Sequence, residues 1–475
     1  MQKSTKIVAT IGPVTETEES IEQLIRAGMN VARFNTKHGT PEWHGERMLR
    51  VRKVAKKLGV SVGILLDLQG PEIRITIPGG EAFQIKEGAE VIFTTDEKST
   101  DPKKPMIPQI VVDALEEGNK IMIDDGLGEF VVTKSTGSEL HARALSTFMV
   151  SNRKTLNTPG VLVDLPSLIE PDLVQLDGVV EQKIEVDFVG LSFVRDKKDI
   201  DILRSELAKR KLTADIIAKI ENQSAVDHIE EIIDASDAIM VARGDLAVEV
   251  PYQELTYWQK MIIRLSREKG KPVITATQML KSMVDKPRPT RAEVSDVANA
   301  IYDGTDAVML SEETTIGEYP VEAVKTQATI ANFNEQFAQP VVIDIPEHDS
   351  SSYITHASVF LLENSLNPQN ALKIDKIVCL TESGRTAKLL SRYRPPHELH
   401  VLTSNDDVFR KLSLVYGVIP HVVKLPKNKL ESSGNLTEKI KDLGIAKPGE
   451  IILLVHGTFW KQPGLTNTLA LVTIE

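Results

Sequence analysis

Short apolar runs rich in β-branched residues recur along the first two thirds of the chain, and amphipathic segments separate them. Near-continuous apolar runs of this length are typical of parallel strands buried on both faces. The segment TETEESIEQLIRAG (15–28) has early acidic residues, apolar spacing of three and four, and a glycine stop, which predict a helix. Alternation of strands and helices predicts an α/β fold, a (β/α)8 TIM barrel. The eight predicted strands are TKIVATIG (5–12), NVARFN (30–35), VGILLDL (62–68), FVGLSF (188–193), ADIIAKI (214–220), AIMVAR (238–243), PVITAT (272–277) and AVMLS (307–311).

The gap between the third and fourth runs is far longer than the others. Residues 71–153 lie within it, are rich in Gly, Pro and Thr, and show alternating strands such as KIMIDDGLGEFVV. This pattern predicts an all-β domain inserted at the C-terminal end of the third barrel strand, on the face where barrel active sites lie. An insert at that position is expected to act as a lid.

A second α/β pattern follows a linker-like stretch after residue 335. It includes the strand-like runs KIVCL, HVLTSN and EIILLVHG, with helical patterns between them. The predicted organisation is therefore a first barrel segment (1–70), an inserted β-barrel lid domain (71–153), a second barrel segment (154–340) and a C-terminal α/β domain for effector binding or oligomerisation (345–475).

The composition is that of an ordinary globular protein with an acidic balance. The chain has 475 residues, with 56 Lys and Arg, 67 Asp and Glu, and a net charge of −11. That balance argues against general nucleic-acid or membrane-surface binding. The single cysteine, Cys379, excludes a disulfide within the chain and a thiolate zinc site. No signal peptide or bilayer-spanning apolar run is evident, so a cytoplasmic location is expected.

Polar residues gather where the predicted strands end, which is where a barrel places its catalytic groups. Glu221 and Asp245 follow neighbouring strands and offer the hard oxygen ligands that suit Mg²⁺ or Mn²⁺. Lys219 lies two residues before Glu221, so both side chains point the same way on an extended chain. These groups suit an anionic substrate whose charge must be held during transfer. The full set of strand-end residues is Arg33, Asn35, Asp67, Ser192, Arg195, Lys219, Glu221, Arg243, Asp245, Thr277 and Ser311.

A salt-bridged rim of the barrel is the alternative for any one of these charges. For the whole set it is disfavoured, because burying so much charge without a ligand is costly.

Several longer motifs occur in order along nearly the whole chain. They are GPEIR (70–74), KIEN (219–222), MVARGDLAVE (240–249), ITATQML (274–280), PTRAEVSDVANAIYDGTDAVMLSEET (289–314) and GLTNT (464–468). Together they resemble the pyruvate kinases. The resemblance implies transfer of the phosphoryl group of phosphoenolpyruvate to ADP, giving pyruvate and ATP in glycolysis. It also implies a homotetramer.

The resemblance assigns roles to the strand-end residues. It implies that Glu221 and Asp245 bind the divalent metal and that Lys219 offsets the charge that develops on the phosphoryl group. Arg33 is expected to clamp the substrate phosphate with its guanidinium fork. Thr277 is expected near the methylene carbon, in or beside the path that protonates the enolate.

Other groups are expected to bind the rest of the substrates. Backbone amides of Gly244 and Asp245, at a helix start, would hold the substrate carboxylate. Arg74 and Lys154 resemble nucleotide-phosphate contacts at the lid hinges. Asn35 and His38 resemble further nucleotide contacts. For His38, an ordinary hydrogen-bonded loop histidine is an equally open interpretation.

Many pyruvate kinases need K⁺, and the stretches that form their monovalent site differ in this chain. Where the family has NFSHG and DTKGPEIR, this chain has NTKHG and DLQGPEIR. Asn35 and Asp67 are retained, but Lys37 stands at the serine position and Leu68 at the threonine position. Two oxygen ligands are therefore replaced, one by a cation and the other by a hydrocarbon.

An ammonium carries the charge of K⁺ and donates three hydrogen bonds. We hypothesise that Lys37 reaches Asp67 and Asn35, places its charge where K⁺ would lie, and makes K⁺ unnecessary. The better-known K⁺-independent relatives instead carry lysine at the position of Glu72, which this chain retains. The alternative is that Lys37 points to solvent and that the K⁺ site is weak or lost.

The C-terminal stretch TESGRTA (381–387) places small hydroxyl residues and a glycine between an apolar strand and a helix. Such a turn can cradle a phosphate, and in the family this region binds phosphorylated allosteric effectors. Helix capping by a hydroxyl is equally open. The candidate effector residues are Thr381, Ser383, Gly384, Arg385 and Thr386.

Two other functions compete with an active kinase. A non-catalytic phosphoenolpyruvate or effector sensor could use the same fold, although the intact strand-end set argues against it. A metal-dependent lyase or aldolase of the phosphoenolpyruvate-binding barrels would not explain the lid, the nucleotide contacts or the C-terminal domain.

Overall fold

The computed structural model of the chain describes residues 3–338, 349–370, 372–424, 433–457 and 466–475. The predicted linker after residue 335, the predicted domain limits at 340 and 345, and the first two residues of the GLTNT motif lie wholly or partly outside these residues.

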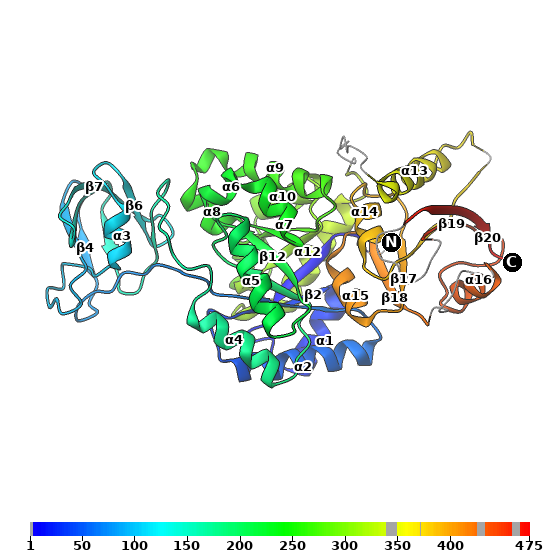
Figure 1. The fold of residues 1–475 in the computed structure, drawn as a ribbon, viewed down its shortest axis with the longest axis horizontal. Helices are drawn as coiled ribbons and strands as arrows, with labels where there is room; N and C mark the ends of the chain where they lie inside the picture. Colours follow the sequence, from blue (N-terminus) through cyan, green and yellow to red (C-terminus); the bar gives the residue numbers. More distant parts are fainter. Residues whose placement is uncertain (1–2, 339–348, 371, 425–432, 458–465) are drawn as a thin grey trace.

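Eight parallel strands close into a barrel in the order β1-β15-β14-β13-β12-β11-β3-β2 (Figure 1). All eight predicted strands are confirmed, each shorter than its apolar run. Every residue of β1, β3 and β13 is buried, as expected for strands covered on both faces. The strands are β1 (Lys6–Thr10), β2 (Val31–Asn35), β3 (Gly63–Asp67), β11 (Phe188–Leu191), β12 (Asp215–Ile220), β13 (Ala238–Ala242), β14 (Val273–Ala276) and β15 (Ala307–Leu310).

Helices surround the barrel and connect its strands, as Figure 1 shows. They are α1 (Glu18–Ala27), α2 (Pro41–Leu58), α4 (Glu170–Glu181), α5 (Lys197–Lys209), α6 (Gln223–Asp227), α7 (Ile229–Ala235), α8 (Arg243–Glu249), α9 (Leu255–Glu268), α10 (Arg291–Tyr302), α11 (Glu312–Thr315) and α12 (Pro320–Asn334), with the 3-10 turns η1 (Tyr252–Glu254) and η2 (Lys281–Val284).

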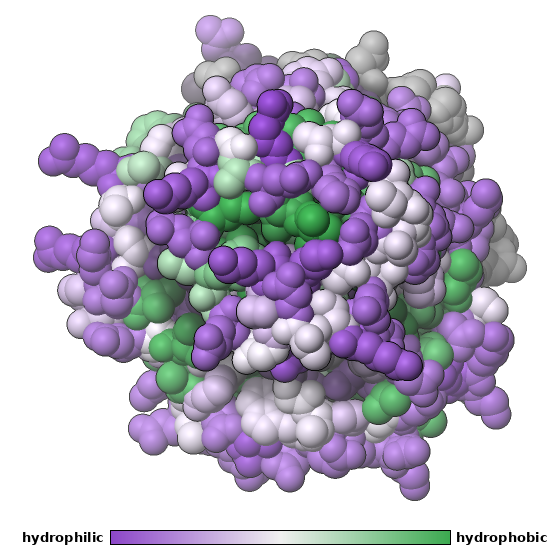
Figure 2. All heavy atoms as spheres, turned by 90° about the vertical axis from the view of Figure 1, so that its left-hand side faces the viewer, coloured by the Kyte–Doolittle hydropathy of each residue, from purple (hydrophilic) through white to green (hydrophobic). Residues whose placement is uncertain are grey.

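An antiparallel lid follows β3 in the chain and precedes β11, so the predicted all-β insertion is confirmed. It forms a five-stranded sheet, β10-β6-β7-β8-β5, and a two-stranded sheet, β4-β9, at one end of the molecule (Figure 1). Figure 2 views this end and shows a largely hydrophilic surface with hydrophobic patches between the polar groups. The lid contains β4 (Phe83–Ile85), β5 (Glu90–Thr94), α3 (Gln109–Ala114), β6 (Lys120–Ile123), β7 (Gly128–Ser135), β8 (Glu139–Ala144), β9 (Phe148–Val150) and β10 (Leu156–Asn157).

The C-terminal region forms a mixed sheet in the order β18-β17-β16-β19-β20, with only β19 and β20 antiparallel. This sheet and its helices lie at the opposite end of the barrel from the lid (Figure 1). The elements are α13 (Ser350–Ser365), β16 (Lys376–Leu380), α14 (Arg385–Ser391), β17 (Leu399–Thr403), α15 (Asp406–Lys411), η3 (Leu412–Leu414), β18 (Val418–Val422), α16 (Ser433–Asp442), β19 (Ile451–His456) and β20 (Thr468–Thr473).

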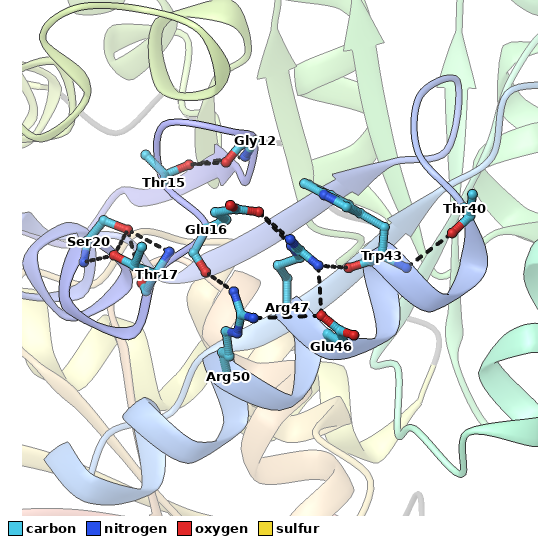
Figure 3. A network of polar contacts seen from close by, with 10 residues as sticks. All are labelled: Gly12, Thr15, Glu16, Thr17, Ser20, Thr40, Trp43, Glu46, Arg47 and Arg50. Atoms are coloured by element: carbon cyan, nitrogen blue, oxygen red, sulfur yellow. Dashed lines mark hydrogen bonds and ion pairs between the residues drawn. The ribbon is translucent and has the colours of Figure 1, made fainter.

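Polar contacts join the loop that follows β1 to helix α2 (Figure 3). Arg47 of α2 donates to the carboxylate of Glu16 at 2.9 Å, and Arg50 donates to the carbonyl of Glu16 at 2.8 Å. Thr40 caps α2 by accepting from the amide of Trp43. The loop between β1 and α1 is therefore tied to α2, and the loop between β2 and α2 is fixed at its α2 end.

Strand β1 begins where the barrel meets the C-terminal sheet. The ammonium of Lys6 is buried there and donates to the carbonyl of Val418 at 2.8 Å. Burial lowers the pKa of Lys6 to about 8, because a charged amine loses its hydration inside the protein.

The lowered pKa of Lys6 makes the free energy of unfolding depend on pH. Between about pH 8 and the ordinary value of 10.5 the unfolded chain binds the extra proton, so stability should rise with pH across this window. Across this pH window, the free energy of unfolding of the wild type should rise by at most about 3 kcal/mol relative to that of Lys6→Met. Urea denaturation of both proteins at several pH values measures this, with the exposed Lys57→Met as control. A Lys6→Met difference that stays constant with pH would contradict the prediction.

Candidate active site

A charge cluster lies at the carboxyl ends of β2, β3 and β12, with the carboxylate of Asp67 at its centre. Arg33 places Nε 2.7 Å and Nη2 2.6 Å from Asp67 Oδ2. Lys219 Nζ lies 3.5 Å from Asp67 Oδ1 and 2.9 Å from Glu221 Oε1. The side chains of Asp67 and Glu221 are each only 1% exposed. The predicted convergence of lysine, arginine and carboxylates at one mouth is therefore what the structure has.

The strand register brings these side chains together. Asn35 of β2 pairs with Asp67 of β3, and Arg33 pairs with Thr10 of β1, whose hydroxyl accepts from Arg33 Nη1 at 2.9 Å. The two-residue spacing of Lys219 and Glu221 aims both into the same site, as the alternation of an extended strand requires.

The charges shift one another's protonation. Burial alone would lower the pKa of Lys219, but the carboxylates of Asp67 and Glu221 outweigh it and raise that pKa above its ordinary value. Burial alone would raise the pKa of Asp67, but Lys219 and Arg33 lower it below its ordinary value. Both groups are therefore charged at neutral pH, and each stabilises the other.

Glu221 is held by a backbone group that the sequence did not reveal. The amide of Phe193 donates to Glu221 Oε2 at 2.6 Å, and Phe193 has the unusual φ of 55°. Its neighbour Ser192 accepts from Lys219 Nζ at 2.7 Å and donates to the carbonyl of Leu68 at 2.7 Å. The turn after β11 thus orients both the lysine and the carboxylate. Ser192 of this turn is in the predicted set of strand-end residues, but Phe193 is not.

Asp245 lies in the first turn of α8, close enough to Glu221 for their charges to interact. Burial first, and the charge of Glu221 second, raise the pKa of Asp245 to about 7. Two crowded carboxylates with this mutual repulsion fit a divalent cation that would neutralise both. Among the described residues, no group of three or more metal-ligating side chains occurs. A pair suits Mg²⁺, which keeps water and substrate oxygens in its coordination sphere.

Thr277 follows β14 and lies against the start of α8. Its hydroxyl accepts from the amide of Gly244 at 2.8 Å. The helix start predicted at Gly244 and Asp245 is present, because α8 begins at Arg243. The Gly244 amide, predicted to bind substrate, already donates to Thr277, which leaves the Asp245 amide as the other predicted donor.

Lys37 does not make the predicted contacts. Its ammonium lies 2.8 Å from Glu72 Oε1 rather than on Asp67, and its side chain is 35% exposed. Asn35 Oδ1 accepts from the backbone amide of Lys37 at 3.2 Å, not from the ammonium. The physical reason is that Arg33 and Lys219 already balance the charge of Asp67, whereas Glu72 faces the loop. Lys37 nevertheless contributes to the electrostatics of Asp245, whose pKa its charge lowers.

The predicted nucleotide contacts divide between two places. Arg74 is paired with Glu72 at 2.6 Å and donates to the carbonyl of Arg153 at 2.5 Å. All three residues lie in the segments that join the lid to the barrel. Lys154, in the same segments, is paired with Asp124 at 2.8 Å. His38 lies exposed on the loop after β2.

The imidazole that hydrogen bonds to this loop belongs to His44 of α2. His44 Nε2 lies 2.7 Å from the carbonyl of His38. Sequence reasoning missed His44, because it falls inside a helical pattern that gives no hint of a loop contact.

The candidate effector turn precedes α14. Thr381 Oγ1 accepts from the amide of Gly384 at 3.0 Å, and Ser383 Oγ accepts from the amide of Arg385 at 3.4 Å. Arg385 also pairs with Asp349 at 2.5 Å. Thr386 Oγ1 lies 2.6 Å from the hydroxyl of Thr466. The hydroxyls therefore stabilise the turn itself. The N-cap of α14 is Gly384 and no side chain caps this helix, so neither Thr381 nor Ser383 is the cap that the alternative interpretation expected.

Family models cover both the barrel and the C-terminal region. One described as pyruvate kinase, barrel domain, matches residues 2–324, and one described as pyruvate kinase, alpha/beta domain, matches residues 362–472. The chain belongs to the pyruvate kinase family. It is therefore a phosphotransferase enzyme of glycolysis.

Full-length relatives agree with this family. The pyruvate kinase of Staphylococcus saprophyticus is 41% identical over 475 residues, which cover 99% of this chain and 80% of that protein. The pyruvate kinase of Geobacillus stearothermophilus is 41% identical over 494 residues, which cover 100% of this chain and 81% of that protein. The crystal structure of a pyruvate kinase from Cryptosporidium parvum matches with a TM-score of 0.90 and 31% identity, over 100% of this chain and 97% of that one.

In the portion of the chain that the structure describes, no helix has the length and apolar character needed to cross a bilayer.

Neutralising Asp67 should destabilise this pyruvate kinase. Asp67→Asn leaves Arg33 and Lys219, both buried, without their shared carboxylate, and we expect a loss of about 3–5 kcal/mol in the free energy of unfolding. Urea denaturation followed by circular dichroism measures the loss. Asp177→Asn, which removes a carboxylate that is 55% exposed, is the matched control and should cost less than about 1 kcal/mol. Equal free energies of unfolding for the two variants would show that Asp67 and its two cations do not stabilise the fold.

Proposed function

We propose that this enzyme transfers the phosphoryl group of phosphoenolpyruvate to ADP, through the cluster formed by Arg33, Asp67, Lys219 and Glu221. The observation that carries the proposal is the Lys219 ammonium, on a side chain only 12% exposed and held 2.9 Å from Glu221 and 2.7 Å from Ser192 at the mouth of the barrel. A positive charge that is fixed in place and shielded from water stabilises a transferring phosphoryl group far better than a positive charge in bulk solvent does.

The reaction breaks the bond between the phosphorus and the enol oxygen and forms one to a terminal oxygen of ADP. Lys219 and Arg33 offset charge on the moving phosphoryl group, and Asp67 keeps both cations in position. Glu221 and Asp245 would hold a divalent cation, Mg²⁺ or Mn²⁺, which supplies further neutralisation of phosphate charge. The enolate left behind takes a proton on its methylene carbon, on the side where Thr277 lies, and becomes pyruvate.

The remaining assignments come from the resemblance and are supported by position. Arg74, Lys154, Asn35 and His38 lie where the lid joins the barrel mouth, which suits contacts to the nucleotide. The turn at 381–386, with Gly384 at a φ of 78°, suits a phosphorylated allosteric effector. We also propose that the enzyme assembles as a homotetramer.

Substitution of the central lysine tests the proposed chemistry. Lys219→Met keeps the length of the side chain but removes its charge, and we expect kcat to fall by about 10²–10³. A coupled assay of ATP formation from phosphoenolpyruvate and ADP with Mg²⁺ measures it. Lys209→Met, which removes a lysine that is 65% exposed, should leave kcat unchanged. Full activity of Lys219→Met would refute the assigned role, and a wild type that forms no ATP would favour the phosphoenolpyruvate sensor.

We further propose that the enzyme needs no K⁺, because Lys37 supplies a fixed positive charge in the monovalent-cation region. The Lys37 ammonium pairs with Glu72 rather than with Asp67, so its partner differs from the predicted one. The cation nevertheless stays near the mouth of the barrel. Leu68 is 1% exposed and offers no side-chain oxygen at the position where the family has threonine.

Exchange of the salt tests this second proposal. With K⁺ replaced by tetramethylammonium, the wild type should keep its rate within about twofold, because its cation is covalently attached. The double variant Lys37→Ser with Leu68→Thr should lose activity in tetramethylammonium and regain it in K⁺. Lys57→Ser, a distant lysine on α2, serves as control and should behave like wild type. A large drop in the wild-type rate without K⁺ would sink the proposal.

A further inference from the structure

Two consecutive residues after β14 adopt left-handed backbone. Thr277 has a φ of 72° and Gln278 a φ of 54°. A β-branched residue at positive φ is a genuine outlier, since its side chain crowds the backbone there. Such a conformation persists only where the surrounding structure over-determines it. Contacts to this turn should therefore include groups that impose its geometry.

The guanidinium of Arg243 grips this turn from α8. Its Nε donates to the carbonyl of Ala276 at 3.1 Å, and its Nη2 donates to the carbonyl of Thr277 at 2.7 Å. These two carbonyls belong to the peptide planes on either side of the Thr277 Cα. The relative orientation of those planes is what φ and ψ of Thr277 describe, so one rigid group fixes both.

Asp296 of α10 fixes the plane of that guanidinium in turn. Arg243 Nη1 lies 2.7 Å from Asp296 Oδ1, and Arg243 Nη2 lies 2.7 Å from Asp296 Oδ2. This is a bidentate pair, which adds directional specificity to its charge. The Arg243 side chain is only 10% exposed, so solvent competes little with these bonds.

The turn decides where the Thr277 hydroxyl lies. With this backbone, Oγ1 accepts from the Gly244 amide at 2.8 Å, over the first turn of the helix that carries Asp245. We propose that Arg243, oriented by Asp296, is a positioning residue that holds the Thr277 hydroxyl at the reacting carbon. This inference rests on the proposed function, which places Thr277 beside the methylene carbon, and adds two residues that touch no substrate.

Arg243→Lys tests the inference directly. Lysine keeps the charge but presents a single point donor, so it cannot bind both carbonyls and the carboxylate together. We expect kcat to fall by about tenfold to a hundredfold, because small misplacements of a catalytic group are costly. The KM for Mn²⁺ should stay within about twofold, since Arg243 does not contact Glu221 or the Asp245 carboxylate. Asp296→Asn should give a smaller loss of the same kind.

A double-mutant cycle separates positioning from a merely structural role. If Arg243 acts through Thr277, Arg243→Lys should cost less than about twofold in a Thr277→Ala background. Losses that multiply in the double variant would overturn the inference. Arg204→Lys, which alters an arginine of α5 that pairs with Asp237 in the turn before β13, is the matched control and should keep wild-type kcat.

A crystal structure of Arg243→Lys tests the inference without any activity. Thr277 should leave positive φ, and its hydrogen bond to the Gly244 amide should lengthen. Unchanged backbone at Thr277 would overturn the positioning role, even in a variant with reduced kcat. Failure of the proposed function is distinct, because it would appear as a wild type that forms no pyruvate from phosphoenolpyruvate and ADP.

Discussion

The carboxylate of Asp67 is the interaction on which the mouth of this enzyme depends. Arg33 and Lys219 reach it from two other strands, and neither cation could stay buried without a negative partner. This arrangement lowers the pKa of Asp67 and raises that of Lys219, so both groups are charged at neutral pH. A parallel barrel makes this possible, because it delivers the ends of separate strands to one place while its apolar core supplies the rigidity.

The same barrel face combines two kinds of restraint. The cluster around Asp67 is held by charge, whereas the turn at Thr277 is held by directed hydrogen bonds from one guanidinium. Charge pairs tolerate small displacements, but a hydroxyl aimed at one atom does not. Left-handed backbone occurs beside both, at Phe193 next to Glu221 and at Thr277, as is common where a functional site stores strain.

The fold and the central charges could be predicted from the sequence, because both follow from local pattern. Continuous apolar runs specify buried strands, and a two-residue spacing puts Lys219 and Glu221 on one side. The partner of Lys37 could not be predicted, since Asp67 and Glu72 lie on the same stretch and only the turn between them decides which one faces the loop. Arg243 was recognised as a strand-end residue, but two of its partners are backbone carbonyls, which carry no sequence signal, and Asp296 lies 53 residues away in the chain.

The ion pair between Lys37 and Glu72 also joins the barrel to its lid. Lys37 belongs to the barrel loop, while Glu72 lies on the stalk that leads into the lid and is paired there with Arg74. A pair with this exposure contributes at most about 1 kcal/mol and weakens as salt screens it. That energy corresponds to about a fivefold change in an equilibrium. The contact between the barrel loop and the lid segment therefore weakens as ionic strength rises, whichever salt provides it.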